Sequence, residues 1–219
     1  MRTVLFLVVA CLLASCSSKS KKAQPEESIL SNKELDFAVG VKGTPEKLAG
    51  TILQLKDKKN SADELLEMLD GEFLFKLNKP KKELLLLQDD SDELGYQHLT
   101  FARIHKGVEI WGDELKFHIN DKNELYLFNG DYHPSLPKDV SISPTLTAKE
   151  AEEAAKQALA LSYTNQDETK LYIFPAESEY RPAWRVIVAK ARLAPDQWEC
   201  LVDAETGEVL HKSSLMRTH

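Results

Sequence analysis

The sequence predicts an α+β protein made of two small modules, each with a helix packed on a mainly antiparallel sheet. Three observations predict this class. Strand-like runs follow one another through the middle of the chain, segments with helical spacing stand before and after them, and a proline-rich stretch near residue 140 separates two parts. The 219 residues, 42% hydrophobic and 29% charged, suffice for one or two ordinary cores.

The first residues indicate an export signal. Arg2 precedes the apolar run VLFLVVACLLA, which is short for a membrane span, and small residues stand directly before Cys16. This arrangement resembles the lipobox of bacterial lipoproteins. The resemblance predicts a signal peptide over residues 1–15, a Cys16 whose acyl chains enter the lipid bilayer, and a flexible tether over residues 16–34. The alternative is an ordinary secretory signal in which the cysteine is incidental.

The predicted location is the cell envelope, because either kind of signal takes the mature chain out of the cytoplasm. Ser17 stands where an Asp often marks retention at the inner membrane of enteric bacteria. We therefore expect a lipid-anchored protein, at the outer membrane if the organism is Gram-negative.

Two helices are predicted after the tether. In TPEKLAGTILQLKD, Pro45 occupies a first helical position after Thr44. The apolar residues of this segment recur at helical spacing, namely Leu48, Ile52 and Leu55. In SADELLEMLDG, Ser61 and Glu64 form a capping box, and Gly71 ends a short helix.

Strand-like runs come next, namely EFLFKL, ELLLLQ, YQHLTFARIH, VEIW, ELKFHI and LYLFNGDY. In ELKFHI, Lys116 and His118 alternate with apolar residues, namely Leu115, Phe117 and Ile119. This alternation predicts a sheet with one solvent-exposed face. Turns are predicted at Lys106-Gly107 and over residues 120–123.

Prolines indicate a module boundary near residue 140. Pro134, Pro137 and Pro144 interrupt regular structure there. We therefore predict a first module over residues 35–140, a second over residues 141–212, and a C-terminal tail over residues 213–219.

The second module is predicted to begin with a helix, AKEAEEAAKQALAL, opened by a capping box of Thr147 and Glu150. Small and apolar residues share one helical face, namely Ala151, Ala154, Ala155, Ala158 and Leu159. The strands KLYIFP and AWRVIVAKA follow, and then a hairpin with its turn over residues 203–207. Cys200 shares a strand face with Trp198 and Val202, which predicts a small core residue and leaves no disulfide in the mature chain.

Charge and residue spacing exclude several classes of function. The formal net charge is -7 and the basic residues are dispersed, so no nucleic-acid partner is predicted. No histidine is followed by Glu or lies four residues from another, so a zinc-protease helix is absent. Neither a nucleophile elbow nor a phosphate-binding loop occurs. We predict that the chain is not an enzyme and uses no metal or cofactor.

The stretch GYQHLTFARIHKGVEIWGDELKFHINDKNELYLFNGDY resembles the fungalysin and thermolysin propeptide motif. The resemblance is carried by His98, Phe101, Lys106, Gly107, Val108, Trp111, Gly112, Asn129, Gly130 and Tyr132. The later runs are similar to the PepSY module that follows this motif in precursors of thermolysin-like metalloproteases. That similarity is carried by Pro182, Ala183, Trp184, Asp203, Ala204, Thr206 and Gly207.

In the resembled precursors, the pro-region guides folding of the protease, covers its cleft and is later cut away. The resemblance implies a secreted thermolysin-like zinc metalloprotease as partner. Three interpretations stay open: a separate inhibitor or folding helper, the pro-part of a truncated precursor, or an envelope binding module unrelated to proteases. Candidate partner-binding residues are His98, Phe101, Lys106, Trp111, Trp184, Leu215, Met216 and His219. For the two tryptophans, a core-filling role is the alternative.

Overall fold

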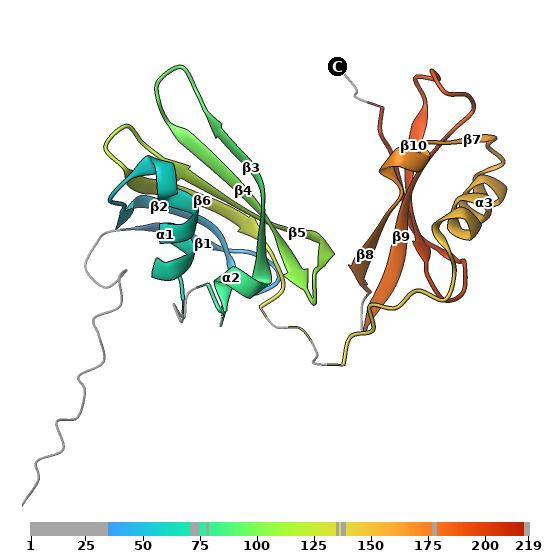
Figure 1. The fold of residues 1–219 in the computed structure, drawn as a ribbon, viewed down its shortest axis with the longest axis horizontal. Helices are drawn as coiled ribbons and strands as arrows, with labels where there is room; N and C mark the ends of the chain where they lie inside the picture. Colours follow the sequence, from blue (N-terminus) through green and yellow to red (C-terminus); the bar gives the residue numbers. More distant parts are fainter. Residues whose placement is uncertain are drawn as a thin grey trace, which may run out of the picture.

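The structure is a computed structural model that describes residues 35–70, 75–77, 79–134, 136, 139–176 and 179–216. The predicted signal, Cys16, the tether up to residue 34, Gly71, Pro137 and His219 lie outside the described residues. The fold is mainly β. Its strands pair into a large mixed sheet in which a first strand group (β1–β6) and a second strand group (β7–β11) are joined between β5 and β8 (Figure 1).

The first strand group is antiparallel, in the order β1-β2-β6-β5-β4-β3. Its strands are β1 (Asp36–Val39), β2 (Pro45–Gln54), β3 (Leu84–Ser91), β4 (Gln97–His105), β5 (Val108–Ile119) and β6 (Glu124–Asp131). The strands predicted from ELLLLQ to LYLFNGDY are confirmed, although VEIW and ELKFHI form one strand, β5. The turns at Lys106-Gly107 and at residues 120–123 are confirmed, and Lys106, Gly107 and Asn123 have positive φ there.

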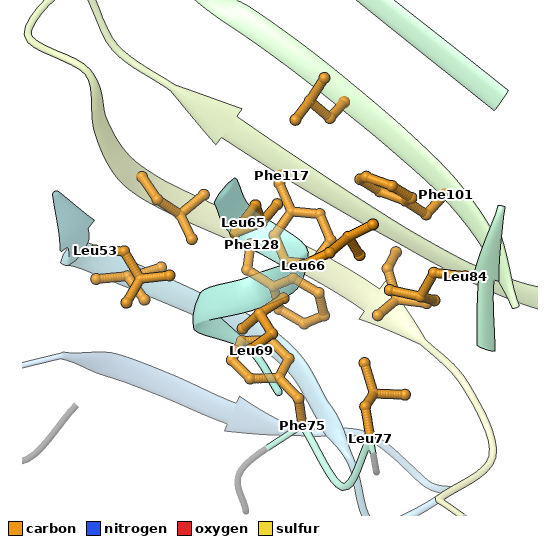
Figure 2. Packing of buried hydrophobic residues seen from close by; sticks show 14 of the residues in the cluster. Leu53, Leu65, Leu66, Leu69, Phe75, Leu77, Leu84, Phe101, Phe117 and Phe128 are labelled. Atoms are coloured by element: carbon orange, nitrogen blue, oxygen red, sulfur yellow. The ribbon is translucent and has the colours of Figure 1, made fainter. Parts of the chain in front are cut away.

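One face of this sheet carries a hydrophobic core (Figure 2). Leu115, Phe117 and Ile119 of β5 are fully buried, as their alternation predicts. The phenylalanines of neighbouring strands, Phe101 and Phe128, meet Phe117 at ring-centroid distances of 5.7 and 5.1 Å. Helix α1 (Ser61–Met68) closes this core with Leu65 and Leu66, next to the single-turn helix α2 (Pro80–Glu83) and the short 3₁₀ helix η1 (Lys58–Asn60).

The helix predicted over TPEKLAGTILQLKD is wrong, because this segment forms strand β2. The register shifts between Ala49 and Leu53, and Gly50 adopts φ 123 at this bulge. A bulge inserts extra residues and breaks the two-residue alternation of a strand. Leu48, Ile52 and Leu53 therefore all reach the core, and Leu55 is buried directly after the strand. The spacing of Leu48, Ile52 and Leu55 thus imitates that of a helix.

Two smaller predictions in this region are also wrong. Helix α1 does not begin with a capping box, because Asn60 is its N-cap and the Ser61 hydroxyl donates to Gln97 Oε1 at 2.9 Å. Glu64 instead accepts a hydrogen bond from the backbone N–H of Lys56. The described part of EFLFKL, residues 75–77, forms no strand, although Phe75 and Leu77 are buried in the core. Burial without alternation cannot distinguish a strand from a core-filling turn.

The second strand group confirms the elements predicted after residue 145. It contains helix α3 (Ala148–Leu159), β7 (Tyr163–Thr164), the 3₁₀ helix η2 (Gln166–Glu168), β8 (Lys170–Pro175), β9 (Tyr180–Ala189), β10 (Gln197–Asp203) and β11 (Val209–Ser214). The capping box of Thr147 and Glu150 is present, with Glu150 N donating to Thr147 Oγ1 at 3.3 Å. Helix α3 packs on β9 and β10 through a small core that includes Ala151, Ala155 and Cys200.

Strand β11 continues to Ser214, so the residues predicted as tail from 213 onwards begin inside the sheet. Every helix in the part of the chain that the structure describes is too short or too polar to serve as a membrane span.

Candidate functional site

Strand β5 changes its surroundings at Gly112, where φ is 74. Its first residues pair with β8 in parallel, Glu109 with Tyr172 and Ile110 with Ile173, whereas Glu114 to Ile119 pair with β6. A positive φ favours glycine, so Gly112 allows the backbone to bend here between the part of β5 that pairs with β8 and the part that pairs with β6. The two strand groups meet at this point of the fold (Figure 1).

Aromatic side chains line the junction. The Trp111 ring meets the Tyr172 ring edge to face, with centroids 5.3 Å apart and planes at 89°. A cavity of about 270 Å³ opens beside them, and Leu87 and Ala102 contribute to its wall. Glu109, which is buried, pairs with the Lys170 ammonium group at the rim. This cavity is small and partly apolar, which suits one or two side chains of a partner better than a large ligand.

A buried carboxylate, Asp113, which also lines this cavity, makes further contacts at the junction. Asp113 accepts from the backbone N–H of His133 at 2.9 Å, and its second oxygen lies 2.7 Å from His133 Nδ1 and 3.2 Å from Lys42 Nζ. The His133 ring then contacts the Tyr180 ring of β9 at 5.6 Å. Asp113 therefore links the first strand group to the second through His133.

Tyr132 stands beside this network and is fully buried. Its hydroxyl donates to the backbone carbonyl of Phe75 at 2.8 Å, and burial raises the pKa of the phenol far above its usual range. The Thr44 hydroxyl donates to the Tyr132 carbonyl at 2.8 Å. These bonds are structural, because both partners of each are buried and satisfied.

Two histidines face each other on the outer surface of the first sheet. His98 of β4 and His118 of β5 are cross-strand neighbours, and their Nδ1 atoms lie 2.8 Å apart. His98 Nε2 also lies 3.3 Å from Asp92 Oδ2. Burial lowers the pKa of His118, the nearby His98 and Lys116 lower it further, and a hydrogen bond with Asn129 opposes them. When the two rings share one proton in this hydrogen bond, adding a second proton to the pair is unfavourable because it places two positive charges side by side.

We expect the protein to lose stability as the pH falls below about 6.5, the usual histidine pKa. Since the folded-state pKa of His118 is lowered, the unfolded chain binds a proton at a higher pH than the folded chain does. The free energy of unfolding therefore decreases as the pH falls through that window. His118→Gln should flatten this decrease in chemical denaturation at a series of pH values. His211→Gln, on exposed β11, is the control. An identical pH slope for wild type and His118→Gln would refute this expectation.

The hairpin of β10 and β11 is organised by Asp203. Its Oδ1 accepts from the backbone N–H groups of Glu205 and Thr206, at 2.8 and 3.0 Å, and its Oδ2 lies 3.1 Å from Arg181 Nη1. Burial raises the pKa of Asp203, but these hydrogen bonds outweigh it and leave the pKa lowered. In the same strand, burial raises the pKa of the Cys200 thiol to about 11, which suits an unreactive core residue.

The structure places the predicted contact residues in different surroundings. Phe101 is 1% exposed in the core, so its side chain is not available to a partner in this conformation. The Lys106 ammonium group lies 3.4 Å from the Val140 carbonyl, and Trp184 Nε1 donates to the Leu146 carbonyl at 2.8 Å. His98, Lys106, Trp111 and Trp184 do not come together at one place. Leu215 and Met216 are 39% and 56% exposed after β11, and His219 lies outside the described residues.

The sequence reasoning missed Leu87, Asp113 and Tyr172. A buried carboxylate between apolar strand residues was the available signal for Asp113, because such a group needs partners. Among the described residues, no group of three or more His, Cys, Asp or Glu side chains is placed to hold a metal ion.

Comparison with known proteins identifies one segment of the chain. Residues 82–132 match the Fungalysin/Thermolysin Propeptide Motif. The chain is 30% identical over 184 residues to thermolysin from Alicyclobacillus acidocaldarius subsp. acidocaldarius, which covers 79% of this chain and 33% of that protein. It is 28% identical over 150 residues to bacillolysin from Bacillus amyloliquefaciens, which covers 64% and 29%. The chain thus spans about a third of the length of these relatives.

The propeptide motif contains β3, β4, β5 and β6 in full. It therefore includes Trp111, Gly112 and Asp113. Tyr172, which contacts Trp111, lies beyond the motif, as do His133 and its ring partner Tyr180. A solved protein of Clostridium difficile 630 aligns with 73% of this chain and 95% of its own, at 14% identity and a TM-score of 0.25, which is too low to establish a shared fold.

Proposed function

We propose that this chain acts on a secreted thermolysin-like zinc metalloprotease in the manner of a pro-region, as an inhibitor, a folding helper or both. The observation that carries the proposal is the propeptide motif over residues 82–132. Its support is the wider similarity to thermolysin, which extends over 184 residues.

Binding, and not catalysis by this chain, is the proposed mode of action. The matched segment is a propeptide motif and not a catalytic domain. A partner enzyme would supply the zinc and the chemistry.

The second strand group is proposed to be the PepSY-like module of such a pro-region. Its support is local: a capped helix α3, the strands β8 and β9, and a hairpin whose Asp203 side chain accepts the turn N–H groups. In the precursors that it resembles, the end of this hairpin leads towards the protease. The same placement would bring Leu215 and Met216 to the partner.

The geometry of the chain after β11 suits this role. Leu215 N still donates to the Gln197 carbonyl at 2.8 Å, so the backbone follows β10 up to this residue. The exposed side chains of Leu215 and Met216 follow the ordered strand directly. A short apolar segment on a rigid support loses little conformational entropy when it enters a specificity pocket.

We expect the purified chain, added separately, to inhibit peptide hydrolysis by thermolysin or bacillolysin in a saturable way. A chain that ends at Ser214 keeps all of β11 and should show the same melting temperature. Its inhibition should be at least about tenfold weaker, a loss of about 1.4 kcal/mol. Lys212→Ala, on exposed β11, is the matched control and should inhibit like wild type.

Three other results would separate the alternatives. Equal inhibition by the truncated chain would move the contact from the tail to the junction around Trp111. Activity only when the chain is fused to a protease would favour the pro-part of a precursor. No effect on either enzyme or on their refolding, with no protease captured from the secreted fraction, would refute the proposal and favour an unrelated envelope module.

The site of action is proposed to be the cell envelope, with the chain anchored through an acylated Cys16. The support is the lipobox-like sequence before this cysteine. Cys16→Ser should release the protein to the soluble fraction or leave its signal unprocessed. Unchanged membrane fractionation, together with no acyl mass on the N-terminal peptide, would contradict the anchor.

A further inference from the structure

Strand β3 is an edge of the sheet. It pairs with β4, and no second strand among the described residues pairs with its other side. Three successive leucines in it, Leu85, Leu86 and Leu87, are 42%, 40% and 47% exposed. Proteins usually protect sheet edges with charges, proline, bulges or covering loops, since a free apolar edge pairs with other strands. Here the register shifts between Leu86 and Gln88, but this bulge leaves all three leucines exposed.

Opposite charges flank these leucines. The stretch KKELLLLQDDSDE places Lys81 and Lys82 before them and Asp89 and Asp90 after them. Lys82, Asp89 and Asp90 are all exposed, and none of them forms an ion pair with a described residue. Strand β3 itself carries only acidic charges, and the basic end of this edge is Lys82 of helix α2, just before the strand. The edge thus has a basic end, an apolar middle and an acidic end.

This pattern is complementary to itself when two strands run antiparallel. The apolar middles then lie side by side, and the basic end of each strand lies against the acidic end of the other. A two-fold axis near Leu86 generates this arrangement twice, as in any isologous dimer. Opposite charges across paired strands stabilise them, whereas like charges directly opposite destabilise them.

The other described edges lack this pattern. Strand β1 has four residues, and its one charge, Asp36, is already paired with Lys47 at 2.6 Å. Strand β11, VLHKSS, carries one basic residue and no acidic one. A foreign basic or acidic strand would match only one end of β3.

We propose that the β3 edge pairs with the β3 edge of a second copy of this chain, which joins two copies through a continuous antiparallel sheet. Main-chain hydrogen bonds between the edges supply the attraction. The two pairs of charged ends select the antiparallel orientation. The inference rests on β3 alone and does not depend on the proposed action on a protease.

A charge-exchange experiment tests this inference on the full chain. Two differently tagged copies are co-expressed, extracted in mild detergent and purified through one tag, and the second tag is quantified. Wild-type copies should co-purify. With the axis at Leu86, position 82 of one copy faces position 90 of the other, so Lys82→Glu paired with itself sets a new glutamate against Asp90, and Asp90→Lys paired with itself sets a new lysine against Lys82. Each variant paired with itself should therefore co-purify at least about tenfold less.

Lys82→Glu tagged with one label and Asp90→Lys tagged with the other should recover co-purification to within about twofold of wild type, since every end again meets its opposite. Adding Leu86→Asp to both copies should abolish this recovery. Lys212→Glu on β11 is the control and should behave like wild type. Thermal melts of each variant confirm that the fold is retained.

Three results would overturn the inference. Wild-type copies that do not co-purify would show that β3 does not associate under these conditions. Undiminished co-purification of the self-paired variants would assign the association to another part of the chain, such as an N-terminal lipid anchor held in the same detergent micelle. A mixed pair that fails to recover while both variants melt like wild type would exclude the antiparallel charge match.

Discussion

Phe117→Ala is expected to lower the free energy of unfolding by about 3–5 kcal/mol, the usual range for removing a buried phenylalanine. Phe117 is fully buried near the C-terminal end of β5 and contacts three other rings. The centroid distances are 5.1 Å to Phe128, 5.7 Å to Phe101 and 6.2 Å to Phe75. Alanine at this position leaves a cavity. The neighbouring strands and the segment around Phe75 cannot all move inward to fill it.

Lys116→Ala is the matched control on the same strand. Lys116 is exposed, and its ion pair with Glu114 joins two side chains that are each about half exposed. Such surface pairs contribute about 0–1 kcal/mol. Urea unfolding of the two variants should therefore separate widely. Equal losses for Phe117→Ala and Lys116→Ala would show that the core in Figure 2 does not carry the stability of the first strand group.

Local patterns predicted β4, β5 and β6 because each of these strands has a buried face and a solvent-exposed face. The alternation of Leu115, Phe117 and Ile119 with polar residues depends only on that geometry. Helix α3 was predictable for a similar reason, since its capping box and its alanine face are both local. These elements require no knowledge of their partners.

Strand β2 could not be predicted in this way. Its bulge between Ala49 and Leu53 is defined by pairing with β6, more than 70 residues later in the chain. The same pairing turns Leu48 and Leu53 to one side, opposite Phe128 and Leu125. A spacing that indicates a helix in isolation thus belongs to an irregular strand, because tertiary pairing overrides local preference.

The candidate site depended even more on distant contacts. Trp111 was predicted as a candidate partner-binding residue, with a core-filling role as the alternative, but its neighbour Tyr172 lies on β8 and meets it only because β5 and β8 pair in parallel. Resemblance to a propeptide indicated the first strand group, and the matched residues 82–132 agree with it. Neither source of information gives the contact between β5 and the second strand group.

The junction also depends on Asp113, and Asp113→Ala is expected to lower the free energy of unfolding by about 3 kcal/mol. The side chain is fully buried, and its removal leaves the backbone N–H of His133 without its acceptor and the Lys42 ammonium group with only the exposed carboxylate of Asp131. An unsatisfied buried group costs more than the bond that it made. The His133 ring would also lose the contact that orients it against Tyr180.

Asp113→Asn provides the comparison, because an amide oxygen can still accept from the backbone N–H of His133 while the charge is lost. We expect it to cost only about 1 kcal/mol in urea unfolding. Limited proteolysis between the strand groups, at residues 139–147, should accelerate in Asp113→Ala and much less in Asp113→Asn, since only Asp113→Ala removes both hydrogen bonds that position His133 against Tyr180 of β9. If both variants unfold and are cleaved like wild type, Asp113 does not support the junction, and the pairing of β5 with β8 and the contacts of Trp111 and Glu109 with β8 hold the two groups together without it.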